Sequence, residues 1–210
     1  MGDVKGSKVT RSERAALTRA RMLDAAYALF CEVGFRAATM AAIAERARVA
    51  VQTLYFTFHT KDELVQAVHD RTVLGEESLP PPMQPWYRSA VAATDISEAV
   101  AELVPGIGAI LARVAPMVPA FHEVAADPAG AVWRHAQDLR RSGMADLVGE
   151  LSKKAARRKG LSEGRASDLM FVYLGPELYR TLVIECGWSF AEWSRWVERA
   201  ILRDLFDLRT

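Results

Sequence analysis

Three adjacent side chains, Val51, Gln52 and Thr53, combine one amide, one hydroxyl and several methyl groups. A glutamine amide can form two hydrogen bonds with the edge of adenine, at N6 and N7, and methyl groups fit against the methyl group of thymine. These residue types predict contacts with base edges in the major groove of DNA.

Two residues on either side of this triplet could bind phosphate. Thr39 is expected at a helix N-terminus, where its hydroxyl and the free backbone amides meet the positive end of the helix dipole. Lys61 is expected in the first turn of another helix, where the dipole disfavours a cation. A phosphate contact therefore explains Lys61 better than a solvated surface charge does.

The elements that must position these residues are two short helices, residues 39–47 and 50–56. Small and polar residues form their outer faces, so the second helix is free to enter a major groove as part of a helix-turn-helix. The inner face consists of apolar residues, namely Met40, Ile43, Ala44, Ala47, Leu54 and Phe58, with Val49 in the turn.

Helices are expected on both sides of this pair. The preceding helix should begin with Ser12 as its cap and end at Gly34, in a left-handed conformation that packs Phe35 back onto Phe30. Thr60 and Glu63 have the spacing of a capping box, which should begin a helix that runs towards Gly75.

The charges of the chain are unevenly distributed. The whole chain has 27 basic and 26 acidic residues, whereas residues 1–60 have nine basic and five acidic ones. A DNA contact is therefore expected at this basic end, which includes an N-terminal arm. The distant Cys31 and Cys186 and the four histidines lack metal-ligand spacing, so we expect reduced thiols, no metal and no cofactor.

The N-terminal segment is polar, and the sequence shows no apolar run approaching the roughly 20 residues of a membrane span. These features predict a cytoplasmic protein.

This segment resembles the DNA-binding signature of the tetracycline-repressor (TetR) family. The resemblance implies a three-helix DNA-binding domain, a larger helical ligand-binding domain, dimerisation through the last two helices, and release from operator DNA when ligand binds. It also implies a phosphate contact for Tyr55, and we include Phe56 with it. The matching residues are Gly34-Phe35, Thr39, Ile43-Ala44, Ala47, Val49, Thr53-Leu54-Tyr55, Phe58, Lys61 and Glu63-Leu64.

Two residues depart from the family pattern. Arg48 stands where glycine is frequent, and a left-handed conformation there would cost about 1 kcal/mol unless the turn has another shape or the side chain reaches a phosphate. Ala50 stands where serine or threonine commonly caps the second helix, which forfeits about 1 kcal/mol of capping.

The hydrophobic pattern has helical spacing nearly throughout and predicts an all-α fold. We place a helix-turn-helix domain at 1–60 and a ligand-binding and dimerisation domain at 61–210, with a connecting helix at 61–75 and a proline-rich loop at 79–85. Beyond the loop, helices are expected at 85–93, 97–121 with interruptions near Pro105 and Pro116, 129–159, 167–186 and 189–208, the last begun by a Ser189–Glu192 capping box.

The last two expected helices contain more apolar surface than one helical layer can cover. A two-fold, four-helix interface would bury the excess and make the protein a homodimer. The expected interface residues are Phe171, Leu178, Leu182, Trp193, Val197, Ile201 and Leu205.

A pocket for an apolar, small-molecule effector is expected in the second domain, because ligand sites in helical bundles are mostly apolar. The candidate lining residues are Trp86, Tyr87, Met117, Phe121, Trp133 and Met144, each of which could equally be packing core.

These features favour a transcriptional repressor that binds a palindromic operator and is released by its effector. Two alternatives are a helical protein that binds DNA without sequence preference and, less favoured, a helical enzyme. No nucleophile, base and orienting group can be recognised together, so we expect no enzymatic activity.

Overall fold

The computed structural model describes residues 10–75, 78–123 and 130–208, and contains no strand in these ranges. The predicted all-α class is therefore confirmed. Backbone contacts divide the chain into two compact units, one before and one after the Val68–His69 peptide bond. The N-terminal arm predicted in residues 1–9 lies outside the described residues.

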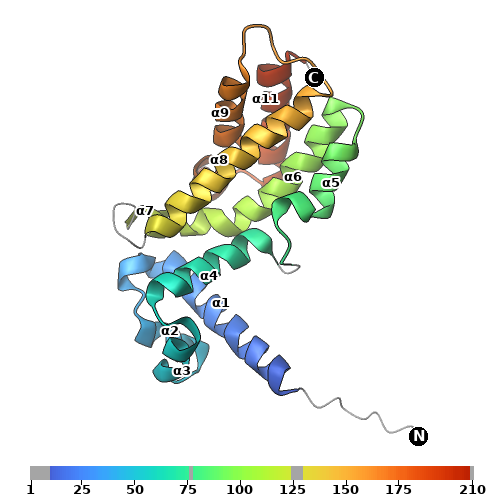
Figure 1. Cartoon of the computed structure of the whole chain (residues 1–210). Helices are drawn as coiled ribbons and strands as arrows, with labels where there is room; N and C mark the ends of the chain where they lie inside the picture. The colour runs from blue at the N-terminus through green and yellow to red at the C-terminus, as the bar shows by residue number, and fades with distance from the viewer. Residues whose placement is uncertain (1–9, 76–77, 124–129, 209–210) are drawn as a thin grey trace, which may run out of the picture. The chain divides into compact units, whose positions relative to one another are not determined.

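The first unit contains α1 (Arg11–Ala37), α2 (Met40–Ala47), α3 (Val51–Phe58) and the beginning of α4 (Lys61–Leu74) (Figure 1). Thr10 caps α1, not Ser12 as predicted: its hydroxyl accepts from the Glu13 amide at 3.2 Å, while the Glu13 carboxylate accepts from the Thr10 amide at 2.6 Å. A capping box needs an acidic residue three positions after the cap, and only Thr10 has one.

Gly34 interrupts α1 as predicted, although in a different backbone conformation. Its φ of 80° and ψ of 172° lie outside the left-handed helical region, in an extended region that is essentially restricted to glycine. The Phe35 ring nevertheless packs on Phe30, with ring centroids 5.6 Å apart. Gly34 therefore redirects the chain and brings Phe35 into the core of the first unit.

The second unit is built around α6 (Ile96–Val114), whose buried side chains pack against α5, α10 and α11. Figure 1 shows α8 beside α9, and α5 beside α6. The other elements in chain order are η1 (Pro81–Met83), α5 (Pro85–Ala92), η2 (Ala115–Met117), α7 (Val118–Glu123), α8 (Ala131–Ser152), α9 (Glu163–Tyr173), α10 (Pro176–Tyr179), η4 (Arg180–Glu185) and α11 (Phe190–Phe206).

Two helix predictions in this unit need correction. Pro105 lies inside α6 without ending it. The helix predicted over 167–186 is instead α9, α10 and the π-helical η4, because Gly175 adopts an extended conformation between α9 and α10. The predicted capping box at Ser189 and Glu192 is confirmed and begins α11.

The prediction that the chain has no apolar stretch of membrane-spanning length was wrong. Residues Ile96–Glu123 are long and apolar enough to cross a membrane, but 61% of the most apolar window is buried inside the chain. Such a stretch is weak evidence for a membrane span, because α6 is the central core helix of the second unit.

Candidate DNA-binding surface and ligand cavity

Helix α3 presents one buried and one exposed face. Leu54 and Phe58 are buried in the first unit. The exposed face holds every residue of α3 that the sequence predicts at DNA, and Phe56 is 85% exposed. These residues are Val51, Gln52, Thr53, Tyr55 and Phe56.

The turn between α2 and α3 is a Schellman motif centred on Arg48. The Arg48 amide donates to the Glu45 carbonyl and the Val49 amide donates to the Ala44 carbonyl, both at 3.0 Å. Arg48 adopts the left-handed conformation, with φ 56° and ψ 50°, and its side chain is exposed. The turn therefore has the shape that glycine favours, and Arg48 bears a conformational cost there.

The N-termini of the two helices are capped differently. The Thr39 hydroxyl accepts from the Ala42 amide at 3.1 Å and caps α2. Ala50 begins α3 without a side-chain cap. Thr39 is exposed, so its hydroxyl proton can still be donated to a phosphate oxygen.

Lys61 is half-buried and binds the backbone of α1. Its ammonium donates to the Phe35 carbonyl and, at 3.5 Å, to the Arg36 carbonyl, and lies 4.2 Å from the centroid of the Phe35 ring. This side chain thus fastens α4 to the turn after Gly34. Its role as a phosphate ligand remains a prediction.

The second unit encloses a cavity of about 490 Å³, within the usual range of small-molecule sites. Four of the predicted residues line it, namely Trp86, Tyr87, Trp133 and Met144. The other two do not: Met117 is fully buried in the core, and Phe121 lies behind Trp133, with ring centroids 4.8 Å apart.

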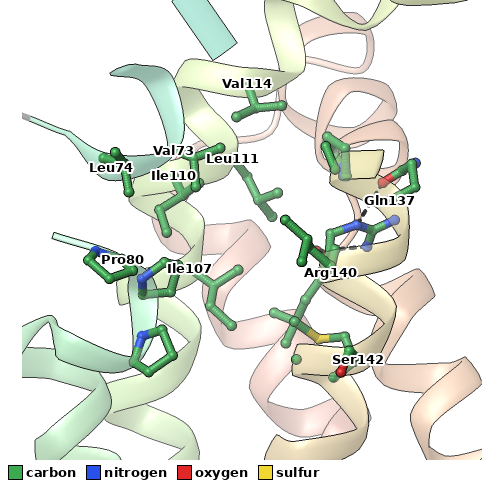
Figure 2. Close-up of a pocket in the computed structure, with 18 of the residues that line it drawn as sticks. Val73, Leu74, Pro80, Ile107, Ile110, Leu111, Val114, Gln137, Arg140 and Ser142 are labelled. Atoms are coloured by element: carbon green, nitrogen blue, oxygen red, sulfur yellow. Dashed lines mark hydrogen bonds between the residues drawn. The ribbon is translucent and has the colours of Figure 1, made fainter. Parts of the chain in front are cut away.

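Polar residues of α8 also line the cavity and were not predicted from the sequence, namely Gln137, Arg140, Ser142 and Asp146; Gln137 and Arg140 are the two that hydrogen-bond to each other. Figure 2 shows them on the opposite wall from Ile107 and Ile110 of α6. Gln137 and Arg140 follow Trp133 at four and seven residues, so they occupy the inward stripe of α8 where apolar residues are expected. This helical spacing from Trp133 could have predicted from the sequence that both polar side chains face the cavity.

His69 of α4 is a further polar residue of the cavity wall. Burial lowers the pKa of its imidazole below the ordinary value, and the nearby Asp70 carboxylate opposes this shift only in part. Its Nδ1 atom is buried without a hydrogen-bond partner and lies 3.8 Å from the Asp70 carboxylate. The neutral imidazole is therefore favoured.

The residues predicted at the dimer interface are mostly buried within one chain. Trp193, Val197, Ile201 and Leu205 of α11 belong to the core of the second unit. Phe171, Leu178 and Leu182 are half-buried, and the guanidinium carbon of Arg140 lies 3.4 Å from the centroid of the Phe171 ring. The α11 stripe is thus covered by this chain's own helices, and the predicted role of these residues in a dimer interface stays a prediction.

In the described ranges, no group of three or more His, Cys, Asp or Glu residues could hold a metal ion. Cys31 and Cys186 are not joined in a disulfide.

Comparisons with known proteins agree with this arrangement. Residues 22–68 match the family model described as bacterial regulatory proteins, tetR family. No curated protein sequence gives a match.

Solved structures with the same fold cover most of both chains. The fatty acid degradation regulator FadR from Bacillus halodurans is 19% identical, with a TM-score of 0.68 over 88% of this chain and 94% of its own. A putative regulator from Saccharomonospora viridis, in complex with choline, is 15% identical, with a TM-score of 0.68 over 90% and 98%. NalD, the secondary repressor of the MexAB-OprM multidrug efflux pump in Pseudomonas aeruginosa, is 16% identical, with a TM-score of 0.65 over 92% and 98%.

Residues 22–68 of this chain therefore have the sequence pattern of the TetR family of bacterial regulatory proteins, and the chain as a whole has the all-helical fold of solved TetR-like regulators.

Proposed function

We propose that this protein is a cytoplasmic, dimeric transcriptional repressor that binds a palindromic operator through α3 and leaves it when a small molecule fills the cavity. The exposed face of α3 carries the proposal. An amide, a hydroxyl, methyl groups and two aromatic rings lie exposed on the second helix of a helix-turn-helix, which is the element that enters the major groove. This role needs no catalytic group.

The course of α4 supports release by an effector. Its first residues, including the buried Leu64 and Val68, belong to the first unit, while His69, Val73 and Leu74 line the cavity of the second. A ligand that binds one arrangement of α4 more tightly than another changes DNA affinity by that difference.

A dimer would place two copies of α3 about one DNA turn apart, as a palindromic operator requires. Because the α11 stripe is buried, we place the interface on the half-buried aromatic cluster of Tyr173, Trp188 and Trp196, which packs against the core and keeps part of its surface exposed. The Trp196 ring contacts both other rings, with centroids 6.0 Å from Tyr173 and 6.1 Å from Trp188. Exposed Val172 and Ile184 extend the apolar surface available on α9 and η4.

Selection of bound sequences from random duplex DNA, followed by footprinting, tests the DNA-binding role. We expect a short palindrome with half-sites about one turn apart. Uniform protection without an enriched sequence would favour the non-specific DNA-binding alternative, and no binding at all would return attention to a helical enzyme. Titration of cavity-binding compounds against the selected DNA then tests release, and ligands that never alter DNA affinity would contradict it.

A further inference from the structure

The cavity has walls of opposite character. Side chains of α6 form an apolar wall that includes Ile107, Ile110 and Leu111 (Figure 2). The facing wall on α8 presents Gln137 and Arg140, which take inward positions of that helix. A ligand that fills such a space matches it best with an apolar body and one polar end.

Arg140 is a half-buried cation without a direct anionic partner. Its Nη1 donates to the Phe171 carbonyl at 2.7 Å and its Nε donates to the Gln137 amide oxygen at 3.0 Å. It forms no ion pair with any residue in the described ranges. The Glu177 carboxylate connects to it only through Gln137, whose Nε2 donates to Glu177 at 3.3 Å.

The partial burial of this guanidinium disfavours its charged form and leaves two of its donors without a described partner. Desolvation lowers the pKa of Arg140 to about 10, and the Glu177 charge offsets only part of that effect. None of the hydrogen bonds described for Arg140 uses its Nη2 atom, which has two N–H donors. A buried charge with free donors is costly until an anion pairs with it.

We propose that the cavity binds an amphipathic carboxylic acid, with the carboxylate on Arg140 and the hydrocarbon against α6. The inference rests on the proposed function only in treating this cavity as the effector site. A carboxylate accepts two hydrogen bonds from a guanidinium in the geometry that arginine favours, and it supplies the missing counter-charge. Ile107, Ile110 and Leu111 then cover the apolar body.

A quaternary ammonium ligand is the principal rival, because Trp86, Tyr87 and Trp133 also line the cavity together with Asp70 and Asp146. Both carboxylates are exposed, so water screens their attraction for a cation. Arg140 is half-buried, so its repulsion of a cation is screened less. The charge balance inside the cavity therefore favours the acid.

Calorimetry on the full chain without DNA tests the proposal with three probes of equal chain length: decanoate, decanol and decyltrimethylammonium. A charge-assisted hydrogen bond predicts that decanoate binds about tenfold to a hundredfold more tightly than decanol. Decanol or decyltrimethylammonium binding as tightly as decanoate, or no binding of decanoate, would overturn the proposal.

Arg140→Gln and Arg141→Gln form a matched pair, because each removes one guanidinium near Phe171 but only Arg140 lines the cavity. Arg140→Gln should abolish the preference for decanoate while decanol still binds, and Arg141→Gln should keep the preference. An unchanged preference in Arg140→Gln overturns the assignment. If that variant does not fold, Arg140→Lys should retain a reduced preference, and full loss in a folded Lys variant counts against the charge argument.

The two proposals fail separately in these experiments. If the cavity prefers decanoate but decanoate does not change operator affinity, release by an effector is contradicted while the proposal of a carboxylic acid ligand stands. If compounds whose binding does not depend on Arg140 release the protein from its operator, the proposal of a carboxylic acid ligand is contradicted while the proposed repressor function stands.

Discussion

At the scale of single residues, the two faces of α3 divide the work between folding and recognition. Leu54 and Phe58 hold the helix against the first unit, and Gln52 lies on its exposed face. No described residue hydrogen-bonds to the Gln52 amide, so the amide can exchange its bonds with water for bonds with a base at little structural cost. Recognition can therefore be changed without changing the fold.

Replacing Gln52 with alanine tests its proposed role in reading a base. We expect Gln52→Ala to weaken operator binding by about 1 to 3 kcal/mol, to relax preference at a single base pair and to leave the salt dependence nearly unchanged. Fluorescence anisotropy with operator and scrambled DNA at several salt concentrations measures all three. Equal weakening on both DNAs would show that Gln52 contributes affinity without sequence preference.

Two substitutions at Arg48 separate the effect of its backbone strain on stability from the effect of its charge on DNA binding. Arg48→Gly should stabilise the protein by about 1 kcal/mol, because glycine adopts the left-handed conformation freely, and should lower the salt slope of DNA binding by about one unit. Arg48→Ala should lower the slope equally without the gain in stability. Thermal denaturation and salt titration of both variants measure these effects, and an unchanged slope in both would exclude a phosphate contact.

The sequence could predict the exposure of α3 because its spacing alone defines an inner face. It could not predict the partner of Lys61, because the Phe35 carbonyl lies 26 residues earlier and reaches Lys61 only after Gly34 has turned the chain. Arg140 was missed for a different reason, since only apolar residues were considered as cavity walls.

At the scale of elements, α6 packs closely because two glycines remove side chains from its surface. A Cβ atom at Gly106 would lie 2.2 Å from the Trp86 ring, and one at Gly108 would lie 2.7 Å from the Trp193 ring. These contacts bring α5 and α11 onto α6 and place Trp86 on the cavity wall. The sequence showed only two glycines in an apolar helix, with no indication of which rings would cover them.

Alanine at Gly108 should therefore destabilise the second unit despite its higher helix propensity. We expect Gly108→Ala to cost about 1 to 3 kcal/mol, since Trp193 is fully buried and must shift. Gly149→Ala in α8 is the matched control: a Cβ atom there meets nothing within 4 Å, so it should stabilise by up to about 1 kcal/mol. Urea denaturation compares the two, and equal effects would mean that α6 and α11 can separate without cost.

The two capping boxes predicted from the sequence, at Thr60 and Ser189, lie at the beginnings of α4 and α11, because each depends only on residues three positions apart; the box at Thr10 was overlooked in favour of Ser12. The division of 167–186 into α9, α10 and η4 escaped the same reasoning. Its apolar residues continue on both sides of Gly175, so hydrophobic spacing alone does not indicate a break.

At the scale of the whole molecule, the apolar stripe of α11 was predicted from the sequence and assigned to an interface with a second copy, whereas helices of the same chain cover it in the structure. Helical spacing identifies an apolar stripe, and a stripe covered by the same chain looks identical to one covered by a second copy. In the structure, α6 and α9 cover the stripe that includes Trp193 and Val197. The aromatic cluster of Tyr173, Trp188 and Trp196, where we propose the interface, is only half-buried and was not predicted there from the hydrophobic pattern.

The proposed dimer predicts a selective effect of charge at this cluster. Trp196→Glu should raise the dimer dissociation constant by more than about tenfold, because truncating a central interface tryptophan commonly costs 2 kcal/mol or more and the new carboxylate would be desolvated. Met83→Glu, at a side chain that is 60% exposed on η1, adds the same charge elsewhere and should leave the dimer intact. Sedimentation equilibrium should show the wild type at twice 23.2 kDa and the Trp196 variant at 23.2 kDa at low micromolar concentration. Circular dichroism checks that both variants are folded.

The Trp196 variant should also lose affinity for the full palindrome while binding an isolated half-site normally, since α3 is unchanged. A folded Trp196 variant that remains dimeric would move the interface to another surface, and a monomeric wild type would remove the dimer from the proposal altogether.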